Sequence, residues 1–548
     1  MDKIWRCHWP VGVEESSIQL PDKPLTSYLK SQAHRVPDRP AIIFYGRAVS
    51  FSELDAATDR MAGWFRSRGL QHGDRVAIFM ENCPQFAIVY FGALKAGGIN
   101  VCLNPMHKAV ELQHEFEDSG ARFLATSDLN YPIVEPIRSK TRLESVLATA
   151  YSEYIPTDPA LPVPPAFFQP ARRFTGTEDL AAAIEEASPL EKPEIWEMRD
   201  TALLQYTSGT TGTPKGAELT MGNVTANCEL TRLFFNVADQ DVQLSVLPWF
   251  HITGMECQMN LMAYCGATLV TLGRFDIETA LSAVQKYRCT LTTLIATINV
   301  ALVNSPKVHE YDLSSLRGCF SGGAPVPPEV ARRWEQVTGH KLVEGYGLSE
   351  TTAPTHINPP QRPKYGTVGV PLPYVEAKVV SLDDEVSDLG TAKSGEIVVR
   401  GPMVMKGYWR NPEASAQYLR EGWFYTGDIG RVDEEGYFTI EERKKDMLKA
   451  SGYSVFPAEV EAIMYRHPAI AEVGVVGVPD PYRGEDIFAF IVLKSGAKGT
   501  VSEEQVIEWC RGEMAVYKSP RRVRFVDALP KTASGKILKR LLREQARV

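Results

Sequence analysis

The sequence lacks the features that would mark a membrane-spanning, disulfide-rich, zinc-binding or nucleic-acid-binding protein. No window of eighteen apolar residues occurs in its 548 residues, which excludes a transmembrane helix. The nine cysteines form no C-x-x-C pair and the ten histidines show no metal-ligand spacing, so neither a disulfide framework nor a zinc site is predicted. The net charge of −8 argues against a nucleic-acid partner.

The same absences predict a location. Scattered, unpaired cysteines are typical of a reducing compartment, so we expect a cytoplasmic protein. Residues 1–8 contain no apolar run and do not form a secretory signal. Peripheral contact with a membrane and assembly into a homodimer are both left open.

A chain of this length exceeds one compact core, so several domains are expected. Strand-like and helix-like stretches alternate over the first two-thirds, which predicts an α/β fold of parallel sheets covered by helices. The expected strands are 76–80, 99–103 and 267–272, and the expected helices are 86–96 and 277–287. The segment 151–170 carries six prolines and is interpreted as a surface excursion.

The pattern changes from about Val370 onward. Short strands at 396–400 and 436–440 are separated by glycine turns and predict an antiparallel sheet or barrel. The dense charge run 441–449 that follows is, on composition alone, a solvated linker. Beyond it, expected helices at 457–466 and 503–514 and strands at 473–478 and 487–493 predict a self-sufficient α+β unit of about a hundred residues.

The most informative segment runs from Tyr206 to Gly216 and reads YTSGTTGTPKG. Its glycines let the backbone approach a phosphate, its hydroxyls donate to phosphate oxygens, and Lys215 adds a positive charge. It is not a Walker A loop, because Pro214 precedes the lysine and Gly216 follows it. A flexible linker is the alternative interpretation of this segment alone.

Four further segments follow in a fixed order. They are SGGAP at 321–325, EGYGLSE at 344–350, WFYTGD at 423–428 and PKTASGKI at 530–537. With the glycine-rich loop, they resemble the motifs of the AMP-forming acyl-CoA synthetases, in the adenylate-forming ligase superfamily, and most of all its fatty-acid–CoA ligases. The resemblance extends from Asp38 to Leu542.

This resemblance implies both the architecture and the reaction. A large amino-terminal domain of two helix-covered sheets and a small β-barrel would span 1–441, a hinge 442–446, and a small mobile α+β domain 447–548. The implied enzyme joins a carboxylic acid to ATP, releases pyrophosphate, and passes the acyl group from AMP to coenzyme A. Its small-molecule partners would be the acid, ATP and coenzyme A, with Mg²⁺ as cofactor.

A carboxylate that attacks the α-phosphate brings one anion to another, so cations and donors are needed there. By resemblance, the loop would hold the departing pyrophosphate, and Glu350 with Thr210 would hold Mg²⁺, a hard ion suited to oxygen ligands. Lys536 would bridge the acid and the α-phosphate; otherwise it is a surface lysine. The implied loop ligands are Thr207, Ser208, Gly209, Thr210, Thr211, Gly212 and Lys215.

The resemblance also implies a nucleoside pocket. Asp428 would accept hydrogen bonds from the ribose hydroxyls with Arg443 as its partner, and Tyr346 would stack on adenine. Ser349 stands where many relatives have Thr, and its hydroxyl would donate to the α-phosphate. The remaining implied pocket residues are Gly323, Glu344, Gly345 and Gly347.

The two half-reactions need different groups at one place. Lys445 matches the family's hinge position, and rotation there would withdraw Lys536. The residues that would then approach coenzyme A are Lys449, Ser451, Gly452 and Tyr453. Arg274 stands where relatives contact the nucleotide end of coenzyme A, and an ordinary surface arginine is the equal alternative.

The segment PWFHITG at 248–254 matches the family's acyl-pocket motif. Amino-acid-activating relatives have Asp where this chain has His251, so an amino-acid substrate is disfavoured. His251 would gate the acyl tunnel beside the carboxylate, or else be a core histidine. Gly254, Gly322, Gly323 and Gly347 are expected to keep the pocket floor small, which permits a long acyl chain.

We therefore predict a medium- or long-chain fatty acid as substrate. An aryl or aryl-propenoic acid is the alternative, and so is delivery of the acyl-AMP to an acceptor other than coenzyme A. A non-catalytic binding protein of the same fold is disfavoured, because Lys215, Glu350, Asp428, Arg443 and Lys536 are all present.

Overall fold

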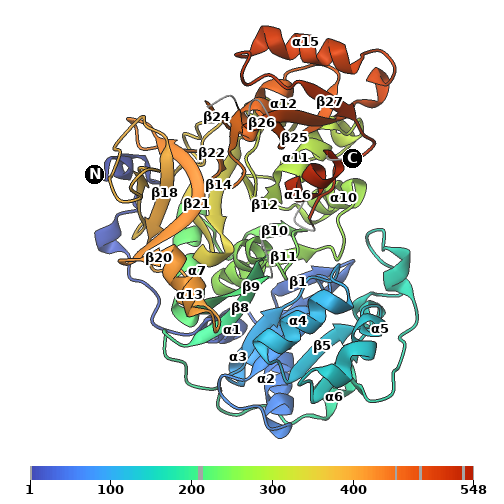
Figure 1. Ribbon diagram of the computed structural model, residues 1–548. Coiled ribbons are helices and arrows are strands. Elements are labelled where there is room, and N and C mark those ends of the chain that lie inside the picture. The colour runs from blue at the N-terminus through green and yellow to red at the C-terminus, as the bar shows by residue number, and fades with distance from the viewer. Residues whose placement is uncertain (1–2, 208–213, 451–452, 481–483, 533–536, 547–548) are drawn as a thin grey trace.

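The computed structural model describes residues 3–207, 214–450, 453–480, 484–532 and 537–546 (Figure 1). Within them lie two large helix-covered sheets, an antiparallel sheet beside them, and a terminal unit with its own sheet, as the α/β prediction required. No described helix is both long enough and apolar enough to cross a membrane.

The first large sheet has nine strands. Its central strands are parallel, but β1–β2 and β14–β15 pair in antiparallel fashion, so the sheet is mixed rather than wholly parallel. In spatial order the strands are β16 (Val370–Pro371), β15 (Ala353–Ile357), β14 (Leu342–Leu348), β13 (Gly318–Gly322), β12 (Leu291–Ile295), β10 (Val242–Ser245), β11 (Thr268–Thr271), β1 (Pro40–Phe44) and β2 (Arg47–Ser50).

The second large sheet has eight strands, and its antiparallel edge carries the glycine-rich loop. The β8–β9 hairpin flanks that loop, and β19 extends the same edge. The strands are β19 (Gly407–Tyr408), β9 (Lys215–Thr220), β8 (Thr201–Thr207), β4 (Ile99–Cys102), β3 (Arg75–Phe79), β5 (Phe123–Ser127), β6 (Ser145–Thr149) and β7 (Glu178–Asp179).

Helices cover both large sheets, and one of them is buried all round. All twelve residues of α3 (Pro84–Lys95) are buried, which explains why its sequence is apolar on every face. The other helices here are α1 (Leu25–Arg35), α2 (Phe51–Ser67), α4 (Ala109–Ser119), α5 (Tyr131–Val134), α6 (Leu180–Glu186), α7 (Met221–Phe235), α8 (Ile252–Gly254), α9 (Leu261–Cys265), α10 (Ile277–Tyr287), α11 (Ala296–Asn304), α12 (Pro328–Thr338) and α13 (Pro412–Tyr418).

The antiparallel sheet stands where the sequence predicted a small barrel, and Figure 1 shows it in orange to one side of the large sheets. Its strands are β17 (Glu376–Val380), β18 (Gly395–Arg400), β20 (Leu419–Arg420), β21 (Trp423–Val432) and β22 (Phe438–Arg443). The interpretation of 441–449 as a solvated linker is wrong at both ends of the run, because β22 runs on to Arg443 and β23 (Leu448–Ala450) follows, which leaves only 444–447 between the two strands.

The terminal unit (residues 448–546) forms apolar clusters that include no residue from earlier in the chain. Helix α14 and strand β25 pack together, and α16 packs on the same strand. The elements are β23, β24 (Tyr453–Val455), α14 (Pro457–Met464), β25 (Ile470–Asp480), β26 (Gly484–Leu493), α15 (Glu503–Glu513), β27 (Arg522–Phe525) and α16 (Lys539–Ala546).

The proline-rich segment 151–170 is more than a surface excursion. Tyr151, Leu161 and Phe167 are buried, and the Tyr151 and Phe167 rings stack with centroids 4.1 Å apart. The segment is therefore anchored in the core by aromatic side chains, while its prolines shape the surface between the anchors.

Two of the glycines expected to keep a pocket floor small are required by the backbone instead. A Cβ on Gly347 would lie 1.8 Å from the Ala353 carbonyl oxygen across the β14–β15 pair, and one on Gly254 would lie 2.3 Å from that of Pro248. By contrast, a Cβ on Gly322 would meet nothing closer than 3.6 Å.

Gly347→Ala should therefore lower the free energy of unfolding by about 3 kcal/mol, since a strand backbone must move to admit the methyl group. Gly322→Ala is the matched control and should change that free energy by less than about 1 kcal/mol. Urea denaturation of both variants checks this, and equal stability of the two would contradict the packing argument.

Candidate active site

The glycine-rich loop is closed at its base by the β8–β9 hairpin. Thr207 and Lys215 are register partners, and the Thr207 hydroxyl donates to the Lys215 carbonyl oxygen at 3.4 Å. The predicted phosphate ligands Ser208, Gly209, Thr210, Thr211 and Gly212 lie outside the described residues. The two ends of the loop are thus placed side by side, as a loop that wraps a phosphate requires.

Tyr408 links Lys215 to Glu350, and Tyr418 places a second ring near the lysine. The Lys215 ammonium lies over the rings of Tyr408 and Tyr418, 5.2 and 5.5 Å from their centroids. The Tyr408 hydroxyl donates to Glu350 Oε1 at 2.8 Å, and burial with the nearby Glu350 charge raises the pKa of Tyr408. Tyr408 therefore stays protonated and orients the carboxylate while its ring faces the cation.

The position of Glu350 suits an ion bound through nucleotide phosphates. Its Oε2 accepts no hydrogen bond from any described residue, and the side chain is only partly buried. One carboxylate with a free oxygen is the donor set that Mg²⁺ takes when phosphates supply other ligands. Its predicted companion Thr210 lies outside the described residues.

A strained corner follows Glu350. Thr352 and Ala353 have φ of 53° and 74°, consecutive left-handed conformations that non-glycine residues rarely adopt. The Thr352 hydroxyl donates to the Met403 carbonyl oxygen at 2.8 Å, and Met405 N–H donates to the Glu350 carbonyl oxygen at 2.8 Å. The corner thus fixes the backbone at Ser349 and Glu350, which lie in the short helix Ser349–Thr351.

Asp428, Arg443 and Tyr346 form a second group. Asp428 and Arg443 are opposite each other in the β21–β22 register, and Arg443 Nε lies 2.7 Å from Asp428 Oδ1. The Tyr346 hydroxyl donates to Asp428 Oδ2 at 2.5 Å. Burial, with the Asp428 charge, raises the pKa of Tyr346, so its hydroxyl remains a donor to the carboxylate.

Glu344 is the first residue of the segment EGYGLSE and lies on β14, two residues before Tyr346. Its Oε2 accepts the Val326 N–H at 2.8 Å, and burial raises its pKa to about 8. Gly345 and Gly347 continue β14, and Gly323, with φ of 79°, follows β13. Adjacent strand ends therefore bring the motifs at 321–325 and 344–350 to one edge of the nine-stranded sheet.

His251 stands at the beginning of α8, where its ring Nδ1 accepts the Thr253 N–H at 3.3 Å. The Gln205 side chain of β8 donates to the Phe250 carbonyl oxygen at 3.0 Å, which ties this turn to the strand that leads into the glycine-rich loop. Trp249 is fully buried, as expected of a core aromatic, and its indole donates to Ser245 Oγ at 2.9 Å.

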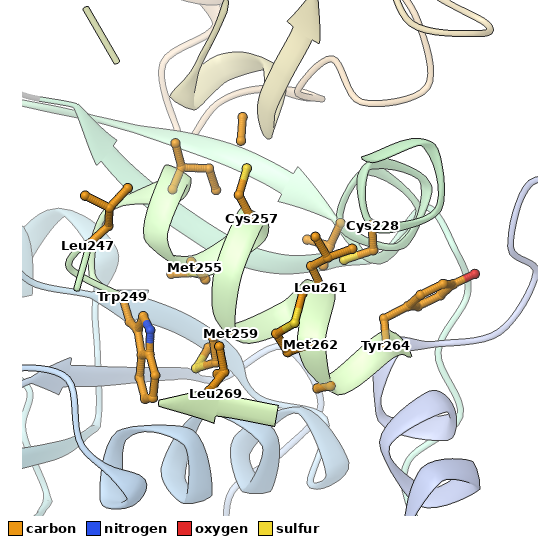
Figure 2. Packing of buried hydrophobic residues seen from close by; sticks show 14 of the residues in the cluster. Cys228, Leu247, Trp249, Met255, Cys257, Met259, Leu261, Met262, Tyr264 and Leu269 are labelled. Atoms are coloured by element: carbon orange, nitrogen blue, oxygen red, sulfur yellow. The ribbon is translucent and has the colours of Figure 1, made fainter. Parts of the chain in front are cut away.

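A sulfur-rich layer follows His251. The π-helix η6 (Met255–Asn260) and α9 carry Met255, Met259 and Met262, all buried. Figure 2 shows these methionines along the helical stretch, with Trp249 and Cys257 nearby. Methionine side chains are flexible and adapt to different packing partners.

Several predicted residues lie apart from these groups. Arg274 is about half exposed, pairs with Glu81 at 3.1 Å and lies over the Phe167 ring at 5.1 Å. Lys445 is exposed between β22 and β23, and Lys449 is on β23, with only its backbone described. Ser451, Gly452 and Lys536 lie outside the described residues, as does the side chain of Tyr453.

Tyr408 and Tyr418 are site residues that the sequence alone does not predict. Tyr408 is 58 residues from Glu350 and reaches it only because β19 pairs with β9, opposite Ala217. A two-residue strand gives no periodic signal, so the sequence offered only the triplet Gly407-Tyr408-Trp409 as a clue.

Residues 29–409 match the sequence profile of the AMP-binding enzymes, and residues 459–536 match that of the AMP-binding enzyme C-terminal domain. The chain belongs to the AMP-binding enzyme family.

Two curated relatives are similar to this chain over nearly its whole length. A long-chain-fatty-acid–CoA ligase of Bacillus subtilis (strain 168) is 39% identical, with 99% of this chain and 98% of that protein covered. A feruloyl-CoA synthase of Amycolatopsis sp. is 36% identical, with 94% and 97% covered.

Among solved structures, MatB from Rhodopseudomonas palustris is similar in two forms. The ATP-bound structure has a TM-score of 0.86 and the apo structure 0.76, each at 30% identity with 96% of this chain and 99% of that chain covered. This chain is therefore arranged more like the ATP-bound form.

The buried Glu344 gives a pH-dependent prediction. Its pKa is raised by folding, so the unfolded chain releases this proton from about pH 4.5 upward while the folded chain holds it to about pH 8. The group thus lowers stability progressively as pH rises through this window. Glu344→Gln, which keeps an acceptor for the Val326 N–H, should remove that loss.

Urea denaturation at pH 5.5 and pH 8.5 checks the prediction. The variant should gain stability relative to the parent protein as pH increases. A stability difference that is independent of pH would show that Glu344 is ionised in the folded state.

Proposed function

We propose that this chain activates a carboxylic acid in two steps, first with ATP to form an acyl-AMP and pyrophosphate, then with coenzyme A to form an acyl-CoA and AMP. The observation that carries the proposal is the meeting of Lys215, Tyr408 and Glu350 at the base of the glycine-rich loop. Lys215 supplies a cation there, and Glu350 supplies a carboxylate oxygen that accepts no hydrogen bond from the described residues, which meets the needs of a triphosphate with its metal. Family membership supports the same reaction.

In the first step, a carboxylate oxygen of the acid attacks the α-phosphorus, and the bond to the pyrophosphate oxygen breaks. Lys215 and the loop would receive the charge that develops on pyrophosphate, and the Ser349 hydroxyl would donate to the α-phosphate. Lys536 would bridge the acid and the α-phosphate. The pair Asp428–Arg443 would hold the ribose, and Tyr346 the adenine.

Glu350 would hold Mg²⁺ together with Thr210, and the bound ion would neutralise charge on the phosphates. What the chain itself contributes is the orientation of Glu350. The Tyr408 hydroxyl fixes one carboxylate oxygen, and the strained corner after Glu350 fixes its backbone.

In the second step, the sulfur of coenzyme A attacks the acyl carbon and the bond to AMP breaks. We propose a domain of residues 1–441, a hinge at 442–446 and a mobile domain 447–548, which turns about Lys445 between the steps. Lys449, Ser451 and Gly452 would then approach coenzyme A, with Arg274 at its nucleotide end. The separate apolar clusters of the terminal unit support this division.

A medium- or long-chain fatty acid is the proposed substrate. The fatty-acid ligase relative supports it, and so do the buried methionines Met255, Met259 and Met262 that follow His251 in the chain, because methionine side chains adapt to different packing partners. His251 in place of an acid disfavours an ammonium-bearing substrate. The feruloyl-CoA synthase relative supports the aryl-propenoic alternative.

A reduced compartment suits the nine free cysteines, eight of them buried, and we propose the cytoplasm as the location. A homodimer is the proposed alternative to a monomer, and light scattering of the purified protein distinguishes the two.

AMP release with Mg²⁺-ATP, across acids graded in chain length and aromaticity, tests the function. Release should require coenzyme A for turnover and should be highest for acids of medium or long chain. Highest release for aryl-propenoic acids would favour the alternative substrate. Acyl-AMP that accumulates without thioester would indicate another acceptor, and no release with any acid would indicate a non-catalytic protein.

Tyr408→Phe should raise the Mg²⁺ concentration needed for half-maximal pyrophosphate–ATP exchange by about tenfold, because the carboxylate of Glu350 loses its orienting donor. Tyr418→Phe is the matched control, since the ring near Lys215 is kept and Tyr418 donates no hydrogen bond to Glu350. Equal Mg²⁺ dependence in both variants would contradict the role given to Tyr408.

A further inference from the structure

A cluster of three charged side chains joins the terminal unit to the antiparallel sheet. Lys539, at the start of α16, lies 3.3 Å from Glu442 Oε2 and 3.2 Å from Glu461 Oε1 through its ammonium nitrogen. The three side chains are largely shielded from solvent, with 16%, 6% and 15% of their surfaces exposed. A cation shared by two shielded carboxylates is a stronger link than a surface ion pair.

The two carboxylates belong to different parts of the chain. Glu461 is on α14 of the terminal unit, where it also accepts the Val475 N–H at 2.8 Å. Glu442 is on β22, opposite Ile429 of β21 and one residue from Arg443. Lys539 therefore connects the terminal unit to the strand pair that presents Asp428 and Arg443.

Glu442 makes a second contact with the terminal unit. Its Oε2 accepts the Ala458 N–H in the first turn of α14 at 2.9 Å. A carboxylate at a helix N-terminus is stabilised by the unpaired N–H groups there. Both contacts of this carboxylate with the terminal unit would break if that unit turned about Lys445, because Glu442 is fixed to β21.

We propose that Lys539 is a positioning residue for the first half-reaction, which holds the terminal unit in the observed arrangement by joining Glu442 to Glu461. The inference rests on the two-step function proposed above. The arrangement it would hold is the one more like ATP-bound MatB, with a TM-score of 0.86 against 0.76 for the apo form. Lys539 also follows Lys536 by three residues in the sequence.

If the terminal unit turned, Lys539 would lose Glu442 but keep Glu461 as a partner. Glu461 moves with Lys539 because both belong to the terminal unit, so rotation separates the ammonium from Glu442 but not from Glu461. A buried charge left alone would make rotation prohibitive, whereas a shared cation keeps the two arrangements close in free energy. The pair can thus favour one arrangement without preventing the other.

Arg543 provides a matched control on the same helix. It lies 2.6 Å from Asp446, and both residues fall on the terminal side of Lys445. Rotation about Lys445 would leave this pair intact. Arg543→Gln therefore removes an ion pair of α16 without removing a link across the hinge.

The experiment separates the half-reactions in the full-length protein. Pyrophosphate–ATP exchange reports the first step, with the acid that gives the highest AMP release. Thioester formation from supplied acyl-AMP and coenzyme A reports the second. Lys539→Gln should lower exchange by about five- to tenfold relative to thioester formation, the range of an ordinary coupling between sites. Glu442→Gln should act in the same direction, and Arg543→Gln should leave the ratio unchanged.

Lys539→Arg should restore the ratio, because charge and reach are kept. A merely structural role predicts instead that both half-reactions fall together and that Arg543→Gln behaves like Lys539→Gln, and that result would overturn the proposal. An unchanged ratio in Lys539→Gln would overturn it as well. Failure of the parent protein to exchange pyrophosphate with any acid would instead refute the proposed function, so the two failures are distinguishable.

Discussion

The register between β21 and β22 is the constraint on which the rest of the site depends. It sets Arg443 opposite Asp428 and Glu442 opposite Ile429. Because side chains alternate across a strand, neighbouring residues serve different surfaces. Arg443 pairs with Asp428, which also accepts the Tyr346 hydroxyl, while Glu442 meets Lys539 and the first turn of α14. A one-residue shift of the β21–β22 register would turn Arg443 and Glu442 to opposite faces, and both sets of contacts would be lost.

Tyrosine hydroxyls orient both of the carboxylates, Glu350 and Asp428, that are predicted to lie beside the nucleotide. Glu350 and Asp428 would repel a triphosphate, yet each accepts a hydrogen bond from a tyrosine, Tyr408 and Tyr346 respectively. A phenol that cannot ionise near neutral pH directs a carboxylate without adding a formal charge. Positive charge is then supplied where phosphates would lie, by Lys215, and where a ribose would lie, by Arg443. The tyrosines thereby orient the two carboxylates without adding a negative charge that would offset Lys215 and Arg443.

Much of the fold could be predicted from local signals. Helix α10 begins and ends at the predicted residues, because Asp276 caps its N-terminus and a strong apolar period runs through it. The charge run 441–449 was misjudged, because composition does not show that charges are paired. Glu441 of β22 pairs with Arg431, and Lys444, one residue beyond that strand, pairs with Glu385 and Glu396, so these charges have protein partners. The link between Tyr408 and Glu350 depends on sheet pairing between distant segments, which no local pattern records.

The same electrostatic reasoning applies to the proposed rotation of the terminal unit. Within the described residues, the side-chain ion pair that joins the terminal unit to β22 is that of Lys539 with Glu442, and Lys539 also pairs with Glu461, which belongs to the terminal unit. An apolar interface of similar size would hold the units together too firmly to turn, since buried apolar area gives stability without a substitute partner. Charged groups can exchange one partner for water at modest cost when another partner remains. An enzyme that must present different groups to one intermediate would therefore benefit from a polar junction at the proposed hinge, beside the strand that carries Arg443.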